Sequence, residues 1–327
     1  MVVEPAADHL VWIDGDFLPW GRATMHVSAH HYGVGVFEGV RSYSVGQRAC
    51  VFRLRDHTAR LFRSARMLGL SIPAQYDAAC LDRVQIEVLR KNRLGDAYLR
   101  PFVFYGGTRG LSRDVRGLDV HVAVLALEWK GHPAAAPRRE GVSLRTSTFT
   151  RHHGSLLAKA KANANYMSGI LALQEAQACG ADEALLLDTQ GFVTETSGSN
   201  VFCVQDGVIH TPPVESVLEG ITRHTVIELA RRAGWTVLER RLTRDELYAA
   251  DEIFLTGTAA EVTPVLEFDG RPVGDEGPGP TTTKLRDMYA ALTRGRDAHR
   301  PEWLTWLDLS AAAERPSGAE SFSTQPS

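Results

Sequence analysis

Alternating apolar and polar residues predict a chain of mixed strands and helices. Segments rich in β-branched and aromatic residues predict strands at 11–13, 50–52, 97–105 and 120–127. Apolar residues at helical spacing predict a helix that Gly69 terminates, over 56–68. They predict a second helix after Asp77, whose carboxylate can cap the first turn. This first part of the chain therefore combines α and β structure.

The same mixture continues in the second part of the chain. Helices are predicted at 165–179 and 221–233, and each is followed by a glycine. Thr243-x-x-Glu246 is a capping box that opens a further short helix. Strands are predicted at 183–188 and 252–256. The fold class expected from this pattern is a two-domain α/β or α+β protein of enzyme size.

Proline and small residues separate the two parts. Residues 130–142 contain KGHPAAAPRR, which predicts an interdomain linker. A smaller N-terminal α/β domain is expected at 1–129 and a larger domain at 143–310. Residues 311–327 are small and polar, and this composition predicts a disordered tail.

Composition narrows the classes of partner. The net charge of the 327 residues is −3, so no overall field favours nucleic acid or anionic lipid, and small metabolites are the expected partners. No basic segment followed by an apolar stretch opens the chain, and no run of about 18 apolar residues occurs, so neither a signal peptide nor a membrane span is expected. The four cysteines are scattered, which fits a reducing, cytoplasmic location.

Two lysines stand in a loop of small residues, AKAKANANY at 158–166, just before a predicted helix. Small neighbours leave space around an amine, and a partly buried lysine becomes a nucleophile because its pKa falls readily. Lys159 and Lys161 are therefore candidates for an imine with an aldehyde cofactor. The local sequence by itself favours two solvated surface lysines.

Three further places suit parts of a phosphorylated cofactor. Glu195 is the single carboxylate of 191–202, where it can keep a pyridine nitrogen protonated or simply be solvated. Gly220 precedes a predicted helix whose first amides can bind an anion, and the turn at 257–260 offers amides after a strand. No carboxylate or cysteine completes a metal-ligand set with the histidines at 26, 30 and 31, so no metal is expected.

The order of these motifs resembles the branched-chain aminotransferase family of fold-type IV pyridoxal-phosphate enzymes. The motifs are YGVGVFEGVRSY at 32–43, AYLRP at 97–101, AKANANY around Lys161, TETSGSNVF around Glu195, GIT at 220–222 and LTGTAAEVTPV from 255. Arg60-Leu61 with Ser64-Ala65 belongs to the same set. The resemblance spans residues 10 to 308 and implies the two-domain, D-amino-acid-aminotransferase-like fold.

The resemblance implies roles for the matching positions. Lys161, which Tyr166 follows, matches the lysine that holds pyridoxal 5′-phosphate as a Schiff base. Tyr166 matches the tyrosine on the cofactor's 3′-oxygen, and Glu195 matches the carboxylate on the pyridine nitrogen. The positions matching phosphate ligands are Arg60, Ile221, Thr222 and Thr258. The positions matching substrate ligands are Tyr98 and the amides of Thr258 and Ala259 for the α-carboxylate, Arg100 and Tyr32 for the side-chain carboxylate of glutamate, and Phe37 for the apolar pocket.

The implied reaction is ping-pong transamination between an L-amino acid, branched-chain or related apolar, and a 2-oxo acid such as 2-oxoglutarate. A homodimer is implied, with a loop of the partner closing the pocket. Alternatives are a specialised transaminase of the same fold, a D-amino-acid or (R)-amine transaminase, an aminodeoxychorismate lyase, and a non-catalytic pyridoxal-binding protein.

Several substrate-facing segments depart from the family pattern. The loop at 106–117 lacks the usual Gly-Met-Gly-Val type sequence, and His132 stands where a pocket tyrosine is usual. Asn163-Ala164 and Thr196–Ser199 also differ, whereas the cofactor positions match. This contrast leads to the hypothesis that the preferred donor is not leucine, isoleucine or valine.

Overall fold

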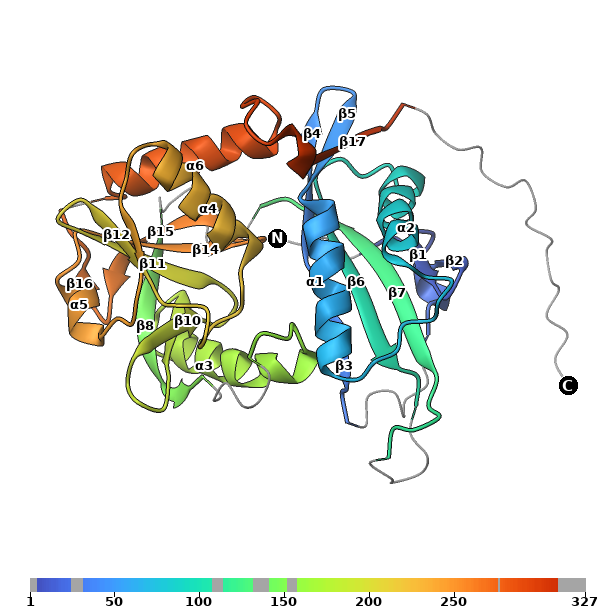
Figure 1. Ribbon diagram of the computed structural model, residues 1–327, viewed down its shortest axis with the longest axis horizontal. Coiled ribbons are helices and arrows are strands. Elements are labelled where there is room, and N and C mark those ends of the chain that lie inside the picture. Colours follow the sequence, from blue (N-terminus) through green and yellow to red (C-terminus); the bar gives the residue numbers. More distant parts are fainter. Residues whose placement is uncertain are drawn as a thin grey trace, which may run out of the picture.

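The computed structural model describes residues 5–24, 32–107, 114–131, 141–151, 158–275 and 277–310. An antiparallel sheet forms the frame of the first half of the chain (Figure 1). Its strands are β1 (Leu10–Ile13), β2 (Asp16–Pro19), β3 (Gly35–Phe37), β4 (Val40–Val45), β5 (Arg48–Phe52), β6 (Ala97–Tyr105), β7 (Val120–Glu128) and β17 (Leu304–Asp308). They lie in the order β17-β5-β4-β6-β7-β1-β2, with β3 beside β6.

A mixed sheet forms the frame of the second half. Its strands are β8 (Val142–Thr150), β9 (Glu183–Leu187), β10 (Val193–Thr196), β11 (Asn200–Gln205), β12 (Val208–Thr211), β13 (Val237–Glu239), β14 (Glu252–Gly257), β15 (Glu261–Phe268) and β16 (Arg271–Pro272). Their order is β10-β9-β8-β15-β14-β11-β12-β13, with β16 beside β15. Strand β8 pairs in parallel with both β9 and β15.

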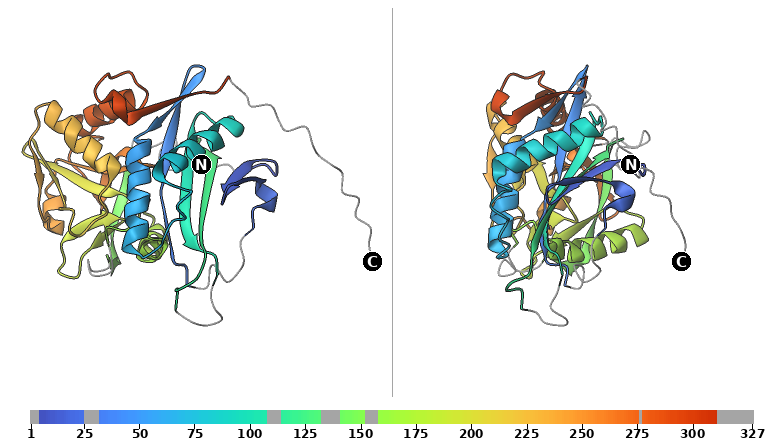
Figure 2. Two further views of the ribbon diagram at one scale, coloured as in Figure 1. Left: turned by 45° about the vertical axis from the view of Figure 1, so that its right-hand side comes forward. Right: turned by 90° about the vertical axis from the view of Figure 1, so that its right-hand side faces the viewer.

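Helices pack against each sheet. Helices α1 (Leu54–Met67) and α2 (Ala78–Lys91) cover one face of the first sheet (Figure 2). Helices α4 (Ile221–Arg232) and α6 (Pro280–Thr293) pack on each other and on the second sheet, and α3 (Met167–Ala178) packs on β8 and β9. Helix α5 (Arg244–Tyr248) is short. Helix α1 consequently stands between the two sheets in Figure 1.

A shared apolar core joins the two halves. The ring of Phe52, on β5, lies 5.6 Å from the ring of Tyr289 on α6 and 6.0 Å from that of Trp303. These side chains belong to one buried cluster with residues of α4 and β11. Burial of apolar surface therefore fixes the first sheet against the helices of the second half.

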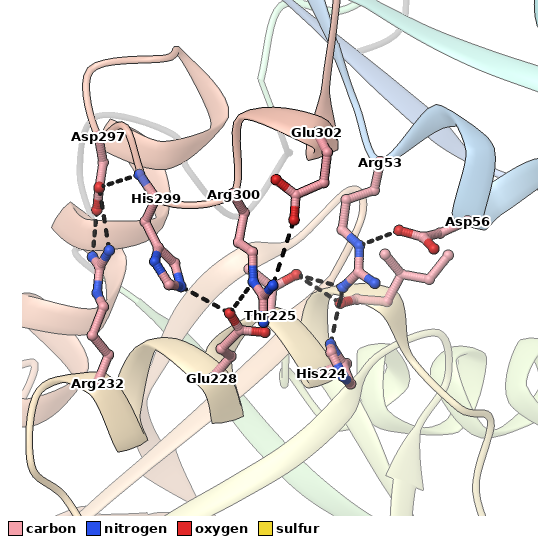
Figure 3. Close-up of polar contacts among 11 residues, drawn as sticks. Arg53, Asp56, His224, Thr225, Glu228, Arg232, Asp297, His299, Arg300 and Glu302 are labelled. Atoms are coloured by element: carbon pink, nitrogen blue, oxygen red, sulfur yellow. Dashed lines mark hydrogen bonds and ion pairs between the residues drawn. The ribbon is translucent and has the colours of Figure 1, made fainter.

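Polar contacts reinforce this junction at the start of α1 (Figure 3). The Arg53 guanidinium donates from Nη1 to the Thr225 hydroxyl at 3.1 Å and to the Ile221 carbonyl at 3.3 Å, both on α4. One turn further along α4, Glu228 accepts hydrogen bonds from His299 and Arg300. The Arg53 contacts hold the first turn of α4 beside α1, whereas Glu228 connects the middle of α4 to the segment that leads into β17.

Most predicted elements are confirmed within one or two residues. The Asp77 carboxylate accepts the Cys80 amide at 2.7 Å, and α2 follows it. Gly69 and Gly234 end their helices with φ of +72° and +88°, in the left-handed region that suits glycine. The helix predicted at 165–179 differs at its start, because Asn163–Tyr166 forms a 3₁₀ turn and α3 begins only afterwards.

The proposed domain limits remain a prediction. Sheet membership changes between Glu128 and Val142, and most of the linker at 130–142 lies outside the described residues, as does the whole tail at 311–327. Near the other end, β17 returns to the first sheet and pairs antiparallel with β5. In the described part of the chain, no helix combines the length and apolar character needed to cross a membrane.

Candidate active site

A cavity of about 580 Å³, counting its open mouth, lies between α1 and the loops of the second half. All seven positions that match cofactor ligands line it: Arg60, Lys161, Tyr166, Glu195, Ile221, Thr222 and Thr258. These residues span almost 200 positions of sequence, and the fold gathers them around one space. The cavity is also lined by Arg151, Ser199, Asn200 and Thr256.

The geometry separates the two candidate lysines. Lys161 donates from Nζ to the Tyr166 hydroxyl at 2.5 Å, and its backbone is held from both sides. Its N–H donates to the Ser64 hydroxyl of α1 at 3.1 Å, and its carbonyl accepts the Phe37 amide at 3.1 Å. Lys159 pairs with Glu219 at 3.4 Å, and its side chain is 42% exposed. The surface-lysine interpretation therefore fits Lys159, whereas Lys161 points into the cavity.

An aromatic wall borders Lys161. The Phe37 ring lies 4.9 Å from the Tyr166 ring, and the Arg100 guanidinium lies 4.7 Å from the Phe37 ring and 5.1 Å from the Tyr98 ring. Gly39 makes room for this arrangement, because a Cβ at that position would overlap the Tyr98 hydroxyl. An apolar surface with one cation at its side thus lies next to the lysine amine.

The remaining positions expected to bind substrate do not belong to this aromatic wall. Tyr32 is exposed over 44% of its surface, and Ala259 lies in the turn that links β14 to β15. Of the altered loop at 106–117, residues 108–113 lie outside the described part of the chain, and so does His132. The binding roles of these residues stay predictions.

Glu195 is a fixed carboxylate rather than a solvated one. Its Oε1 pairs with Arg151 Nη2 at 2.7 Å, and its Oε2 accepts the Leu218 amide at 3.0 Å and Asn200 Nδ2 at 3.4 Å. Arg151 also donates to the Asn165 carbonyl at 3.1 Å. No sequence motif pointed to Arg151, whereas Asn200 was visible within the TETSGSNVF motif.

One end of the cavity is suited to an anion. Helix α4 begins at Ile221 with Gly220 as its N-cap and no side-chain cap, so its first amides are available to a ligand. A Cβ on Gly220 would overlap Asn200 Oδ1, so only glycine lets these segments approach so closely. The Thr256 hydroxyl is buried and has no hydrogen-bond partner among the described residues. A buried hydroxyl of this kind is usually satisfied by a ligand or water.

Arg60 is buried beside this end of the cavity and is not a surface arginine. Its Nε and Nη2 donate to the two oxygens of Glu38, at 2.6 and 2.8 Å, and Nη1 donates to the Glu219 carbonyl at 2.8 Å. Burial opposes ionisation of both side chains, but their mutual attraction outweighs it. The pKa of Glu38 therefore lies well below its usual range, and the pKa of Arg60 is raised.

In the described part of the chain, no three or more His, Cys, Asp and Glu side chains are grouped so that they could hold a metal ion. The histidines at 26, 30 and 31 lie outside the described residues. The described cavity offers amine, guanidinium, carboxylate, hydroxyl and amide groups to a ligand.

Residues 35–268 match the family model described as amino-transferase class IV. The chain belongs to the class IV aminotransferase family. This class IV aminotransferase is 46% identical to the branched-chain-amino-acid aminotransferase of Pseudomonas aeruginosa, over 91% of this chain and 97% of that protein.

Solved structures extend the similarity to the fold. The T.th. branched-chain amino acid aminotransferase superposes with a TM-score of 0.86 in complex with N-(5′-phosphopyridoxyl)-L-glutamate, and with 0.85 in complex with 4-methylvaleric acid. In both cases identity is 41%, over 91% of this chain and 98% of that one. This class IV aminotransferase therefore has the fold-type IV architecture, as its sequence predicted. Relatives of this kind do not favour the lyase, D-amino-acid, specialised or non-catalytic alternatives.

Proposed function

We propose that this enzyme transfers an amino group between a branched-chain or related apolar L-amino acid and a 2-oxo acid such as 2-oxoglutarate, with pyridoxal 5′-phosphate as its cofactor. The observation that carries the proposal is the single cavity lined by all seven cofactor positions. Similarity to the branched-chain enzymes of Pseudomonas aeruginosa and T.th. supports it. When bound, the cofactor supplies the electron sink and the carrier for the amino group.

The polar groups of the cavity fit the parts of this cofactor. Lys161 would hold it covalently through Nζ, with Tyr166 beside its 3′-oxygen. Glu195, already fixed by Arg151, would hold a proton at the pyridine nitrogen. Its phosphate would lie at the anion end, against the first amides of α4 and the hydroxyls of Thr222, Thr256 and Thr258.

Lys161 has a second task once its amine is released. Its Nζ can accept the Cα proton of the amino donor in the first half-reaction and donate a proton to Cα of the newly formed amino acid in the second, because a neutral amine is a general base and its conjugate acid a general acid. The Tyr166 hydroxyl, at 2.5 Å, holds that amine in place. One amine serving both half-reactions predicts ping-pong kinetics.

We assign the substrate side to the aromatic wall. Phe37 would contact an aliphatic side chain, and Arg100 would pair with the side-chain carboxylate of glutamate, with help from Tyr32. Tyr98 and the amides of Thr258 and Ala259 would bind the α-carboxylate. Complexes of the T.th. enzyme with a glutamate conjugate and with 4-methylvaleric acid support acceptance of both kinds of side chain.

We also propose a homodimer that covers α3. Met167, Ile170 and Leu171 on this helix are exposed, Met167 over 63% of its surface, and Phe149 is exposed on the adjacent β8. Adjoining exposed apolar side chains are typical of protein interfaces. Replacing Ile170 with Glu should shift the protein toward monomer in size-exclusion chromatography with light scattering, whereas Gln174→Glu, on the same helix, should not.

The function is tested by a donor and acceptor screen on the purified protein. Leucine, isoleucine and valine with 2-oxoglutarate should give turnover that Lys161→Ala abolishes, whereas Lys159→Ala should keep most of it. A kcat/KM for these three donors well below that for other donors would overturn the branched-chain assignment. Pyruvate release from aminodeoxychorismate without an acceptor would identify a lyase instead.

A further inference from the structure

Glu38 is a buried carboxylate beside the cavity that the proposed reaction leaves unused. It lies in the Phe37-Glu38-Gly39 motif, and its exposed surface is 0%. Four N–H groups surround it. Arg60 Nε donates to Oε1, and Oε2 accepts from Arg60 Nη2, from His57 Nδ1 at 2.8 Å and from the Gly39 amide at 3.2 Å.

Stability alone is a poor reason for this arrangement. Desolvating two charges costs several kcal/mol, and apolar residues in place of a buried ion pair often leave a protein equally stable. Burial opposes the charge of Glu38, yet Arg60 and His57 keep its pKa far below the usual range, so it is ionised throughout the working pH. A permanent buried charge of this kind points to a role in orienting the side chains around it.

The cluster formed by Glu38, His57 and Arg60 is connected to the active site through the segment that contains Glu38 and through α1. The Glu38 amide donates to the Pro101 carbonyl at 2.9 Å, and the preceding Phe37 amide donates to the Lys161 carbonyl. On α1, His57, Arg60 and Ser64 are spaced along one face, and Ser64 accepts the Lys161 amide. Glu38 therefore lies where the segment that carries Lys161 meets α1.

Arg60 has donors left for a ligand. A guanidinium carries five N–H groups, and three of those on Arg60 have partners among the described residues. Its Nη1 donates to the Glu219 carbonyl, immediately before the N-cap of α4, so the guanidinium lies beside the anion end of the cavity. Because Glu38 neutralises its charge, Arg60 offers directed hydrogen bonds there rather than net charge.

We propose that Glu38 and His57 are positioning residues that lock the Arg60 guanidinium so that its two remaining N–H groups meet the phosphate of the cofactor. This inference rests on the proposed function. It makes an unusual prediction about sign. Removing the negative charge of Glu38 should weaken phosphate binding, because the Arg60 guanidinium loses its fixed orientation. If only net charge mattered, the same change would strengthen phosphate binding, because Arg60 would no longer be neutralised.

The experiment titrates apoprotein with pyridoxal 5′-phosphate and, separately, with pyridoxal, which lacks the phosphate. Glu38→Gln should raise the Kd of the phosphorylated compound about tenfold, the value of one charge-assisted hydrogen bond, and leave the Kd of pyridoxal within about twofold. In an Arg60→Gln background, the same change should have no further effect on either Kd.

A matched control exists elsewhere in the chain. Glu228 also accepts from an arginine and a histidine, Arg300 and His299, outside the cavity lining (Figure 3). Glu228→Gln should leave both dissociation constants unchanged. If Glu38→Gln fails to fold, His57→Gln replaces it, because it removes one donor to Glu38 and keeps the ion pair. It should raise the Kd of the phosphorylated compound about threefold, again without affecting pyridoxal.

Three results would overturn the inference: unchanged affinity for the phosphorylated compound, tighter affinity, or an equal loss for both compounds. An equal loss would mean that Glu38 only stabilises the fold. Wild-type protein that binds neither compound would instead refute the proposed function, and this inference with it.

Discussion

Arg151 and Asn200 hold the Glu195 side chain in one orientation within the cavity. Three donors contact its two oxygens, so the carboxylate needs no rearrangement when a protonated nitrogen arrives. Preorganised polar groups of this kind are the main means by which enzymes stabilise charge. Of the side chains that support Glu195 and Lys161, Arg151 is the one that lies outside the sequence motifs.

Replacing Arg151 with Met should leave Glu195 as a buried charge without its ion-pair partner. We expect the free energy of unfolding of the apoprotein to fall by about 3 kcal/mol, measured by urea denaturation. Adding Glu195→Gln to Arg151→Met should recover part of the loss, because the uncompensated charge is then gone. A double variant less stable than Arg151→Met alone would contradict this account.

The four cysteines should divide into two pairs by reactivity. Burial raises the pKa of the Cys50 and Cys203 thiols to about 12, whereas Cys179 is exposed and Cys80 is half-buried. A thiol-specific reagent should therefore modify two cysteines quickly in native protein and the other two only after denaturation. Cys179→Ser should reduce the number of quickly modified cysteines to one. Quick modification of three or four cysteines in native wild-type protein would contradict the burial of Cys50 and Cys203.

Helix α1 carries a buried face on each side. Leu61 and Ala65 pack in the apolar core of the first sheet, while His57, Arg60 and Ser64 form its polar contacts near the cavity. The helix itself was predictable, because apolar spacing and Gly69 mark it. Burial of its polar face was not predictable, since polar residues at helical spacing look the same when they face solvent.

Helix α2 offers a simpler test of an element. Its N-cap, Asp77, accepts the Cys80 amide, so Asp77→Ala should lower the free energy of unfolding by about 1 kcal/mol. Asp77→Asn should cost much less, because asparagine caps equally well. Equal losses for the two variants, measured by urea denaturation, would show that the cap is not the cause.

The whole molecule depends on contacts between its halves. The Phe52, Tyr289 and Trp303 rings, the Arg53 contacts to α4 and the pairing of β17 with β5 all join segments that are distant in sequence. Together they place the first turn of α4 opposite Arg60. The cavity therefore exists only when both halves are folded and packed.

Stability should depend on pH through two buried histidines, His57 on α1 beside this junction and His210 on β12. Burial lowers the pKa of His57 below 6.5, despite the opposing effect of Glu38, and burial also lowers the pKa of His210. The unfolded chain then binds more protons than the folded one once the pH falls through 6.5. The free energy of unfolding should fall between about pH 7 and 5.5, by up to about 1.4 kcal/mol per pH unit for each histidine.

His57→Gln should flatten this dependence. Urea denaturation at several pH values would compare the slopes of the variant and the wild type, and identical slopes would contradict a buried neutral His57. Glu38 should not contribute in this range, because its pKa lies far below it.

The sequence alone determined the helices and strands, because caps and periodicity are local properties of the chain, and the order of its motifs indicated the family. It could not choose Lys161 over Lys159 without the family resemblance, and it assigned no role to Arg151, Glu38 or His57. Those choices depend on burial and on partners far along the chain. Arg60 meets Glu38 and Glu219, which lie 22 and 159 positions away. Only packing of the two halves decides whether such a charge faces water, another side chain or the cavity.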